Sequence, residues 1–515
     1  MNIVTSYCCR AKCIFNKGNA ASKRPETFMR SFPLFFIALL LQLCPSASVM
    51  FSQDTRHVTE PKIPAACVTL KARISAVHGV IRDQDEGLLD TDRIQQALDT
   101  CGAGRSVVLH GTGKKNVFLS GPIVLRSGVT LVVDANTALV GSRDPRLYDR
   151  ALGSCGILSE RDKRSAGCKA LISGDGIQDS GVMGYGSIDG RGGNKLLGQD
   201  VTWWDLAHQA QIIKKRQSVF DLITIQHAKN FTLYKITLRN APGSHVGVGD
   251  TDGFTAWGVN IMTPGTARNT DGIDPGSSRN VTIAYCSIHD GDDNVAVGSG
   301  KGEPASNISI LHNHFYAGHG MSIGSGTSGG IDHMLVDDLT IDGARNGIRI
   351  KSDRSRGGLV HDLIYRNICI RNVANPLAFN PFYDPTFGGD LLPIYRDITL
   401  GKIHILTAGS YMLLGLDSQH KLGLTLDDVF ADDQQHSKML AKDAEITIAK
   451  RSGNLEPSGE DVTVHQTSGA SPGEPLNCDA RFVPFPNLIK APEMVGAPPP
   501  VGRSVHAASD SKGNN

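Results

Sequence analysis

Apolar and polar residues alternate in short runs that recur through the middle of the chain. These runs begin at residues 231, 254, 281, 308, 334 and 359. Successive starts lie 23 to 27 residues apart, and Gly, Asn or Asp flank most runs. Alternation with β-branched residues predicts strands joined by tight turns. A repeat of this length without helical periodicity predicts a parallel β-helix, an all-β solenoid.

The regions before and after the repeat have different patterns. Residues 88–102 have the pattern of a short helix, and we expect them to cap the open first coil of the solenoid. The final residues, 495–515, are rich in Pro, Gly and Ser and are expected to be disordered. We therefore predict a β-helix domain over 49–470 and a C-terminal tail over 471–515.

Three of the predicted strands follow an asparagine, at Asn230, Asn280 and Asn307. Each heads an N-x-S/T sequon, the acceptor motif for N-glycosylation. Equivalent residues of a parallel β-helix stack at the spacing of paired strands, about 4.8 Å, and stacked amides form hydrogen-bonded ladders. We expect an internal ladder at these positions rather than glycosylation sites.

An apolar run at 31–43 follows Arg30 and precedes small residues at 46–48. Its length suits the core of a secretory signal peptide and is short for a membrane span. We expect residues 1–48 to be an N-terminal extension and signal peptide, with an uncleaved anchor as the alternative. The cleaved protein would be secreted and extracellular, without stable membrane association.

Seven of the 11 cysteines follow the predicted signal peptide: Cys67, Cys101, Cys155, Cys168, Cys286, Cys369 and Cys478. An oxidising compartment favours disulfides, and an odd number leaves at least one thiol unpaired. The sequence does not fix the connectivity, although Cys155 and Cys168 close a short loop. Cys286 and Cys369 lie in apolar runs, where we expect buried free thiols.

The charges nearly cancel, with 52 Lys and Arg against 51 Asp and Glu. This balance gives no general electrostatic basis for binding nucleic acid or a membrane surface, although local cations can still hold an acidic polymer. Aromatic residues make up only 6% of the chain, whereas there are 57 Gly, which favours a turn-rich β protein. No CxxC motif or Cys/His cluster indicates a metal, and we expect no cofactor.

Four polar clusters interrupt the repeat. They are Asn269–Gly272, Gly291–Asn294, Gly318–Gly320 and Arg349–Lys351. If each step between clusters is one coil, all four lie on one face of the solenoid. Neighbouring carboxylates are costly unless they share protons or meet cations, and such groups concentrate at active sites.

The residue types in these clusters indicate a chemistry. Cleavage of a glycosidic bond needs one protonated carboxyl to assist the leaving oxygen and one carboxylate to activate water. Asp271, Asp292 and Asp293 offer such groups, and Arg349 and Lys351 suit a substrate with a carboxylate on each sugar.

The same motifs resemble those of a known enzyme family. NTDGIDP (269–275), GDDNVAVGSG (291–300), GHGMSIGSG (318–326) and RIKS (349–352) are together similar to the pectinase glycoside hydrolases of family 28. The likeness is greatest to the endopolygalacturonases of plant-pathogenic bacteria and covers roughly 58–460. It implies a right-handed parallel β-helix that needs no metal. It also implies an enzyme that hydrolyses α-1,4-linked galacturonate bonds in pectin, with inversion at the anomeric carbon.

The resemblance also implies roles for the catalytic residues. The position of Asp292 is that of the general acid, while those of Asp271 and Asp293 hold and activate the water. His319 would tune the protonation of the acid.

Four further residues match substrate-binding or ordering positions. Asn269 would order the carboxylate network, and Arg349 and Lys351 would bind the galacturonate carboxylate. Tyr383 matches the family's later substrate-contacting tyrosine, with a core position as the alternative.

The likeness further implies the disulfides Cys67–Cys101 and Cys155–Cys168, and it leaves Cys478 without an obvious partner. One position departs from the pattern, because Gly298 stands where the related bacterial enzymes often place Lys. We therefore expect a difference at a subsite, with the catalytic set intact.

Three other functions remain open from the sequence. They are an exo-acting polygalacturonase, a β-helix pectate lyase that uses calcium, and a non-catalytic β-helix that binds polysaccharide. In each case the expected partner is the pectin polymer, and we expect a monomer.

Overall fold

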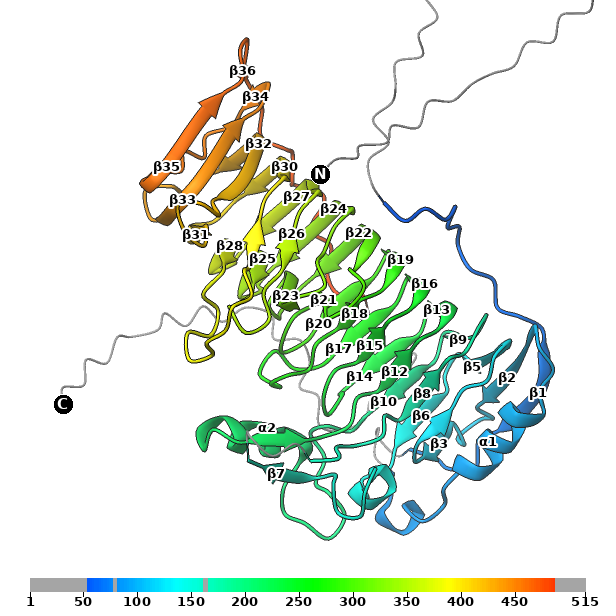
Figure 1. The fold of residues 1–515 in the computed structure, drawn as a ribbon. Coiled ribbons are helices and arrows are strands. Elements are labelled where there is room, and N and C mark those ends of the chain that lie inside the picture. The colour runs from blue at the N-terminus through cyan, green and yellow to red at the C-terminus, as the bar shows by residue number, and fades with distance from the viewer. Residues whose placement is uncertain (1–52, 77–80, 161–164, 487–515) are drawn as a thin grey trace, which may run out of the picture. The chain divides into compact units, whose positions relative to one another are not determined.

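The computed structural model describes residues 53–76, 81–160 and 165–486. Thirty strands in these residues join into one extended sheet, nearly all of whose pairs are between parallel strands of successive coils. Figure 1 shows the coils stacked in chain order from β1 to β35. The protein is a right-handed parallel β-helix, as predicted, since parallel crossovers take this hand.

The strands form three rows, one on each side of the coil. The first row runs through β4 (Ile123–Val124), β8 (Ile172–Asp175), β12 (Ile223–Gln226), β15 (Val246–Gly249), β18 (Ile273–Gly276), β21 (Val295–Ser299), β23 (Met321–Thr327), β25 (Asn346–Lys351), β28 (Asn375–Asn380) and β31 (Ser410–Leu414).

The second row is the longest. It runs through β1 (Ala66–Lys71), β2 (Arg105–His110), β5 (Val129–Val133), β9 (Gly181–Met183), β13 (Lys229–Tyr234), β16 (Asp252–Trp257), β19 (Arg279–Ala284), β22 (Ser306–Phe315), β24 (Met334–Asp342), β27 (Leu363–Arg371), β30 (Ile398–Ile405), β32 (Leu422–Ala431), β33 (Lys438–Ile448) and β35 (Gly459–Gln466).

The third row contains short strands. It runs through β3 (Val117–Ser120), β6 (Ala138–Gly141), β10 (Ser187–Asp189), β14 (Thr237–Arg239), β17 (Asn260–Met262) and β20 (Ser287–His289), and it ends on the second half of β22. Pairs of short strands lie outside the rows: β7 (Ile157–Ser159) with β11 (Arg216–Ser218), β26 (Leu359–Val360) with β29 (Ile394–Tyr395), and β34 (Arg451–Ser452) with β36 (Ser471–Pro472).

The core is a stack of inward apolar side chains. Phe231 pairs in register with Phe254, and Phe254 with Val281, so that like positions meet on neighbouring coils. The two Phe rings stack at 6.4 Å between centroids. Burying each such side chain contributes about 1.5–3 kcal/mol, so repetition of the apolar pattern sustains the fold.

A helix covers the first coils, as the sequence predicts. Helix α1 (Thr91–Thr100) buries Ile94, Ala97 and Leu98 and packs against β2 and β4. Short 3₁₀ turns, η1 (Asp83–Asp85) and η2 (Pro145–Tyr148), flank this region. A second helix, α2 (Trp203–Ile212), lies beside the coils together with β7 (Figure 1).

The predicted asparagine ladder is wrong, although the repeat that motivated it is real. Asn230, Asn280 and Asn307 occupy equivalent turn positions with φ of 54°, 55° and 57°. Gly253 lies between the first two in the stack, and Asn307 follows Asn280 directly. Asn230 is exposed and donates to Asp179, and Asn280 donates to Asp252. Asn tolerates this left-handed conformation, so these residues serve the turn and do not line the interior.

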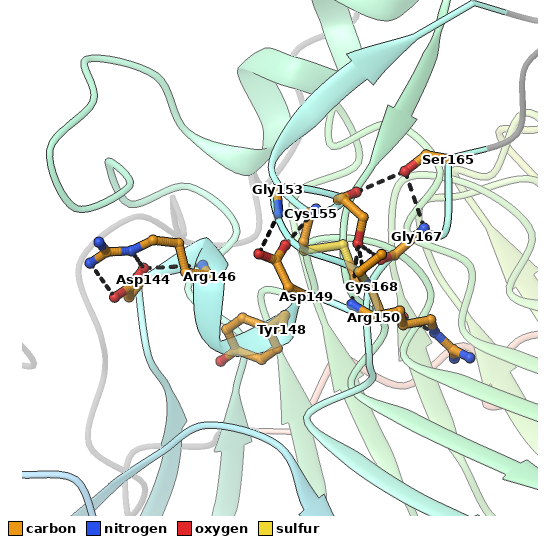
Figure 2. The surroundings of a disulfide bond; sticks show 12 residues. Asp144, Arg146, Tyr148, Asp149, Arg150, Gly153, Cys155, Ser165, Gly167 and Cys168 are labelled. Carbon is orange, nitrogen blue, oxygen red and sulfur yellow. Dashed lines mark hydrogen bonds and ion pairs between the residues drawn. A yellow bond between two sulfur atoms is a disulfide. The ribbon is translucent and has the colours of Figure 1, made fainter.

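Two predicted disulfides are present. Cys67 pairs with Cys101, and Cys155 pairs with Cys168. Figure 2 shows the second pair beside Asp149, whose carboxylate accepts from the backbone N–H groups of Gly153 and Cys155. Cys286 is a buried free thiol, as expected.

The expectation for Cys369 and Cys478 is wrong. The two residues form a third disulfide across a sequence separation of 109. Arg481 beyond it binds Asp338 and donates to the Asn367 carbonyl. Residues 473–486, predicted as part of the tail, are thus tied to the coil, and the sequence pattern gave no sign of this return.

Some predictions fall outside the described residues. These are the signal peptide, its cleavage site and the disorder of 495–515. Among the residues that the structure describes, no helix has the length and apolar character needed to cross a membrane.

Candidate active site

The first row of strands brings the predicted residues together. Ile273 pairs with Val295, and Val295 pairs with Met321, on three successive coils. Asp271, Asp293 and His319 each lie two residues before one of these paired positions, so they stack at the start of β18, β21 and β23.

The next coil supplies the cations. Arg349 pairs with Ser322 across β25 and β23, which places it one coil beyond His319. The turns between these strands are tight: a Cβ at Gly291 would lie 1.9 Å from the Ala267 carbonyl oxygen. Only glycine fits such an approach, which explains the Gly before the paired aspartates.

Asp293 is the most enclosed member of the site, with 2% of its side chain exposed. Lys351 Nζ lies 2.6 Å from one carboxylate oxygen. Ser322 Oγ and Arg349 Nη1 lie 2.7 and 3.1 Å from the other. Both oxygens therefore accept hydrogen bonds, and Asp293 is fixed in one orientation between two cations.

Asp292 is more accessible, with 15% of its side chain exposed. His319 Nδ1 lies 2.9 Å from one of its oxygens, and Asn269 Nδ2 donates to the other at 3.1 Å. Burial acts to raise the pKa of Asp292, but the hydrogen bond and charge of His319, with the charges of Lys351 and Arg349, outweigh it. The pKa is lowered as a result.

Asp271 behaves in the opposite way. Burial, and then the charges of Asp292 and Asp293, raise the pKa of Asp271 well above its usual value, although Lys351 acts to lower it. Neighbouring carboxylates that are shifted apart in this manner are typical of acid/base sites. Asp271 is thus the carboxyl that binds a proton more readily than Asp292.

A buried histidine holds the backbone of Asp271. His245 donates from its backbone N–H to the Asp271 carbonyl at 2.8 Å, and its Nδ1 lies 2.9 Å from the same oxygen. Nε2 lies 2.8 Å from Thr263 Oγ1. Burial lowers the pKa of His245 to about 4, so the ring is neutral and serves to position Asp271.

The motifs contain further site residues to which the sequence alone assigned no role. Asp274, three residues after Asp271, and Asp290, two before Asp292, have pKa values raised first by burial and then by nearby carboxylates. Both were visible as acidic positions within or beside the motifs. Gln217 could not be recognised from the motifs, because it lies 52 residues before its partner Asn269.

Tyr383 lies beside the cations. Its ring centroid is 5.3 Å from the Arg349 guanidinium carbon and 5.3 Å from Lys351 Nζ. The residue is 41% exposed, so the alternative of a core tyrosine is wrong. The ring and the two cations together present an aromatic and basic surface next to the carboxylates.

Gly298 leaves the neighbouring surface open. It pairs with Gly276, and a Cβ at Gly298 would meet only the Gly326 carbonyl oxygen, at 3.6 Å. This is ordinary van der Waals contact. The position thus has room for a Cβ, so the backbone there does not exclude the lysine that the related bacterial enzymes often have.

Three side chains are close enough to share a cation. Asp292, Asp293 and His319 offer ligand atoms that lie within 4.8 Å of one another, and no other such group occurs in 53–76, 81–160 and 165–486. Asp293 already faces Lys351 and Arg349, whose positive charges oppose a metal ion at the same place. The donor set therefore fits a metal poorly.

The comparison with known proteins gives the family. A profile of Glycosyl hydrolases family 28 matches residues 110–429. The chain belongs to this family. The predicted family, fold class and enzyme class are therefore confirmed, and the chain is a glycoside hydrolase.

Individual relatives agree with this assignment. An endo-polygalacturonase of Pectobacterium carotovorum subsp. carotovorum is 44% identical over 380 residues, covering 74% of this chain and 90% of that protein. A polygalacturonase of Ralstonia solanacearum is 40% identical over 428 residues, covering 73% and 80%. A solved polygalacturonase structure from Erwinia carotovora ssp. carotovora has 42% identity and a TM-score of 0.71, covering 76% of this chain and 100% of that one.

Proposed function

We propose that this family 28 member is an endo-polygalacturonase that hydrolyses α-1,4-linked galacturonate bonds in pectin by inversion. One observation carries the substrate class: Arg349 and Lys351 lie two coils beyond Asp293 and directly contact its carboxylate. Cations at this distance suit a sugar that carries its own carboxylate. Similarity to relatives named endo-polygalacturonase supports internal cleavage of the polymer.

Asp292 is the proposed general acid. It is more exposed than Asp293, so it is the member of the pair that can reach a glycosidic oxygen. Its proton passes to that oxygen as the bond to the anomeric carbon breaks. Asp271 and Asp293 hold the attacking water and take its proton, and attack from the opposite face inverts the anomeric carbon.

The lowered pKa of Asp292 in the free protein has to be reversed for this role. The cations contribute to that lowering. A galacturonate carboxylate bound to Arg349 and Lys351 neutralises them, which raises the pKa of Asp292 and moves the shared proton toward it. Binding of an acidic substrate thereby promotes protonation of Asp292, the general acid, whereas a neutral polymer would not.

We propose that the protein acts outside the cell, as a monomer. Three disulfides lie in the described part of the chain, and disulfides persist in oxidising compartments. Pectin, the proposed substrate, is a long polymer of the cell wall, so an enzyme that cuts it has to act there. Exported protein recovered with these bonds oxidised would support this, and reduced cytoplasmic protein would contradict it.

Digestion of polygalacturonate tests the activity. We expect rapid loss of viscosity with mixed oligomers, and Asp292→Asn should lower kcat by about 10²- to 10⁴-fold, the usual contribution of an acid/base residue. Release of monomer or dimer alone would indicate exo action. An unsaturated, ultraviolet-absorbing product that a chelator abolishes would indicate a lyase. Full cleavage by Asp292→Asn would exclude the proposed mechanism.

A further inference from the structure

Gln217 reaches the active site from outside the three rows of strands. It lies at the centre of β11, where it pairs with Leu158 of β7 in an antiparallel sheet of two strands. The neighbouring helix α2 begins with a capping box formed by Thr202 and Asp205. Trp203 of α2 packs edge-on against Phe220, with 5.2 Å between ring centroids. This insertion is thus anchored to the coil, and Gln217 is held in place.

Gln217 connects to the acid through one amide. Gln217 Nε2 donates to Asn269 Oδ1 at 3.0 Å, and Asn269 Nδ2 donates to Asp292 Oδ2 at 3.1 Å. An asparagine amide has one accepting and one donating end. When its oxygen faces the donor of Gln217, its N–H must face Asp292, and this arrangement favours the ionised carboxylate.

We propose that Gln217 is a positioning residue for the general acid, and that through Asn269 it determines which end of an amide faces Asp292. The proposal rests on the function proposed above, in which Asp292 gives its proton to the leaving oxygen. Gln217 touches neither the reacting atoms nor Asp292, so its effect passes through Asn269.

Other charged groups act on Asp292 from the surrounding elements. The carboxyls are Asp271, Asp290 and Asp293, and the basic groups are His319, Arg349 and Lys351. Near Gln217, Arg216 precedes it on β11, and Lys215 forms an ion pair with Glu160. None of these is altered by substitution at 217, so a change in the pH profile reports the amide relay or the charge introduced there.

Gln217→Glu is the most direct test. A carboxylate at 217 only accepts, so Asn269 has to turn its N–H toward it and present its oxygen to Asp292. Two facing oxygens require a proton between them, so Asp292 stays protonated to higher pH. We expect the alkaline limb of kcat/KM on polygalacturonate to move up by about one pH unit, since one good hydrogen bond to a charged group is worth about that shift.

Two controls separate the relay from a simple charge effect. Gln211→Glu adds the same charge to the exposed end of α2 and should leave the limb in place. In an Asn269→Ala background, Gln217→Glu should no longer move the limb. Gln217→Met, which neither donates nor accepts strongly, should give a smaller upward shift and keeps the test available if Gln217→Glu does not fold.

The outcomes are distinct. An unshifted limb in Gln217→Glu and Gln217→Met, an equal shift in Gln211→Glu, or a shift that survives Asn269→Ala would overturn the relay. A rise in KM alone would make Gln217 a substrate contact and would also overturn it. If the unmodified protein fails to cleave polygalacturonate, the proposed function fails instead, so the two failures cannot be confused.

Discussion

At the scale of single residues, one side-chain type takes different states because its surroundings differ. Asp271 has a raised pKa from burial and two carboxylate neighbours. Asp292, one coil away, has a lowered pKa because His319 and two cations outweigh burial. Such a separation between identical residues is what the proposed acid/base mechanism requires, and it also has a cost in stability.

Asp271→Asn should stabilise the protein at neutral pH while abolishing activity. A carboxyl whose pKa is raised by folding contributes stability below its unfolded value, near 3.8, and loses it as pH rises through the folded value. The amide avoids that loss. We expect Tm to rise by about 1–3 °C at neutral pH, with a smaller gain near pH 4, measured by calorimetry.

Asp200→Asn is the matched control for this change. Its carboxylate is exposed and pairs with Lys195, and that hydrogen bond lowers its pKa. The ionised carboxylate of Asp200 therefore stabilises the folded state at neutral pH, and its replacement is expected to give no gain in Tm there. A fall in Tm for Asp271→Asn at neutral pH would contradict the account of Asp271.

At the scale of elements, the register of the paired strands brings together site residues that are far apart in the sequence. The turns just before β18, β21 and β23 carry the acidic and histidine side chains of the site, β25 carries the two cations, and strand pairing aligns them. The C-terminal segment, residues 473–486, packs against the outside of the coils. It returns past β30 to Cys369 of β27, and Phe482 packs against the guanidinium of Arg371 at 4.0 Å.

Cys478→Ser should release this segment without unfolding the coil. The disulfide spans 109 residues, and the loop-entropy relation gives about 4–5 kcal/mol for a loop of that length. We expect a lower Tm and new proteolytic cuts within 473–486, identified by mass spectrometry. Cys155→Ser opens a bond that spans 13 residues and should cost less, about 3 kcal/mol. A larger loss for Cys155→Ser, or an uncut segment, would contradict this.

At the scale of the whole molecule, charge is balanced and attraction for an acidic polymer is local. The formal net charge is +1, too small to steer a polymer over long distances. Arg349 and Lys351 have side chains only 14% and 9% exposed. Under the proposed function, recognition of the polymer therefore depends on these few cations inside the site.

Added salt should weaken binding of polygalacturonate more than it slows the chemical step. The Debye length falls from about 30 Å at 0.01 M salt to about 3 Å at 1 M. Between about 0.02 and 0.5 M NaCl we expect KM for polygalacturonate to rise several-fold while kcat changes less than about twofold. Lys351→Met should flatten this dependence, whereas Lys442→Ala, on β33 away from the site, should not. A salt effect mainly on kcat would contradict local recognition.

Much of the site was predictable because a solenoid converts sequence spacing into spatial order. Asp271, Asp292, His319 and Arg349 recur at coil intervals, and one coil is one step along the stack. The same logic failed for Asn230 and Asn280. Their repeat was visible, but whether a side chain points inward depends on backbone φ, and both adopt the left-handed turn.

The sequence alone determined the repeat, hence the β-helix, and the polar clusters whose spacing places them on one face. Tertiary structure alone decided which distant segments return to those coils. Cys478 meets Cys369 across 109 residues, and Gln217 meets Asn269 across 52. Such contacts depend on the path of a terminal segment and an insertion that do not share the repeat. Periodicity carries no information about them, because only packing against the finished coil fixes where they lie.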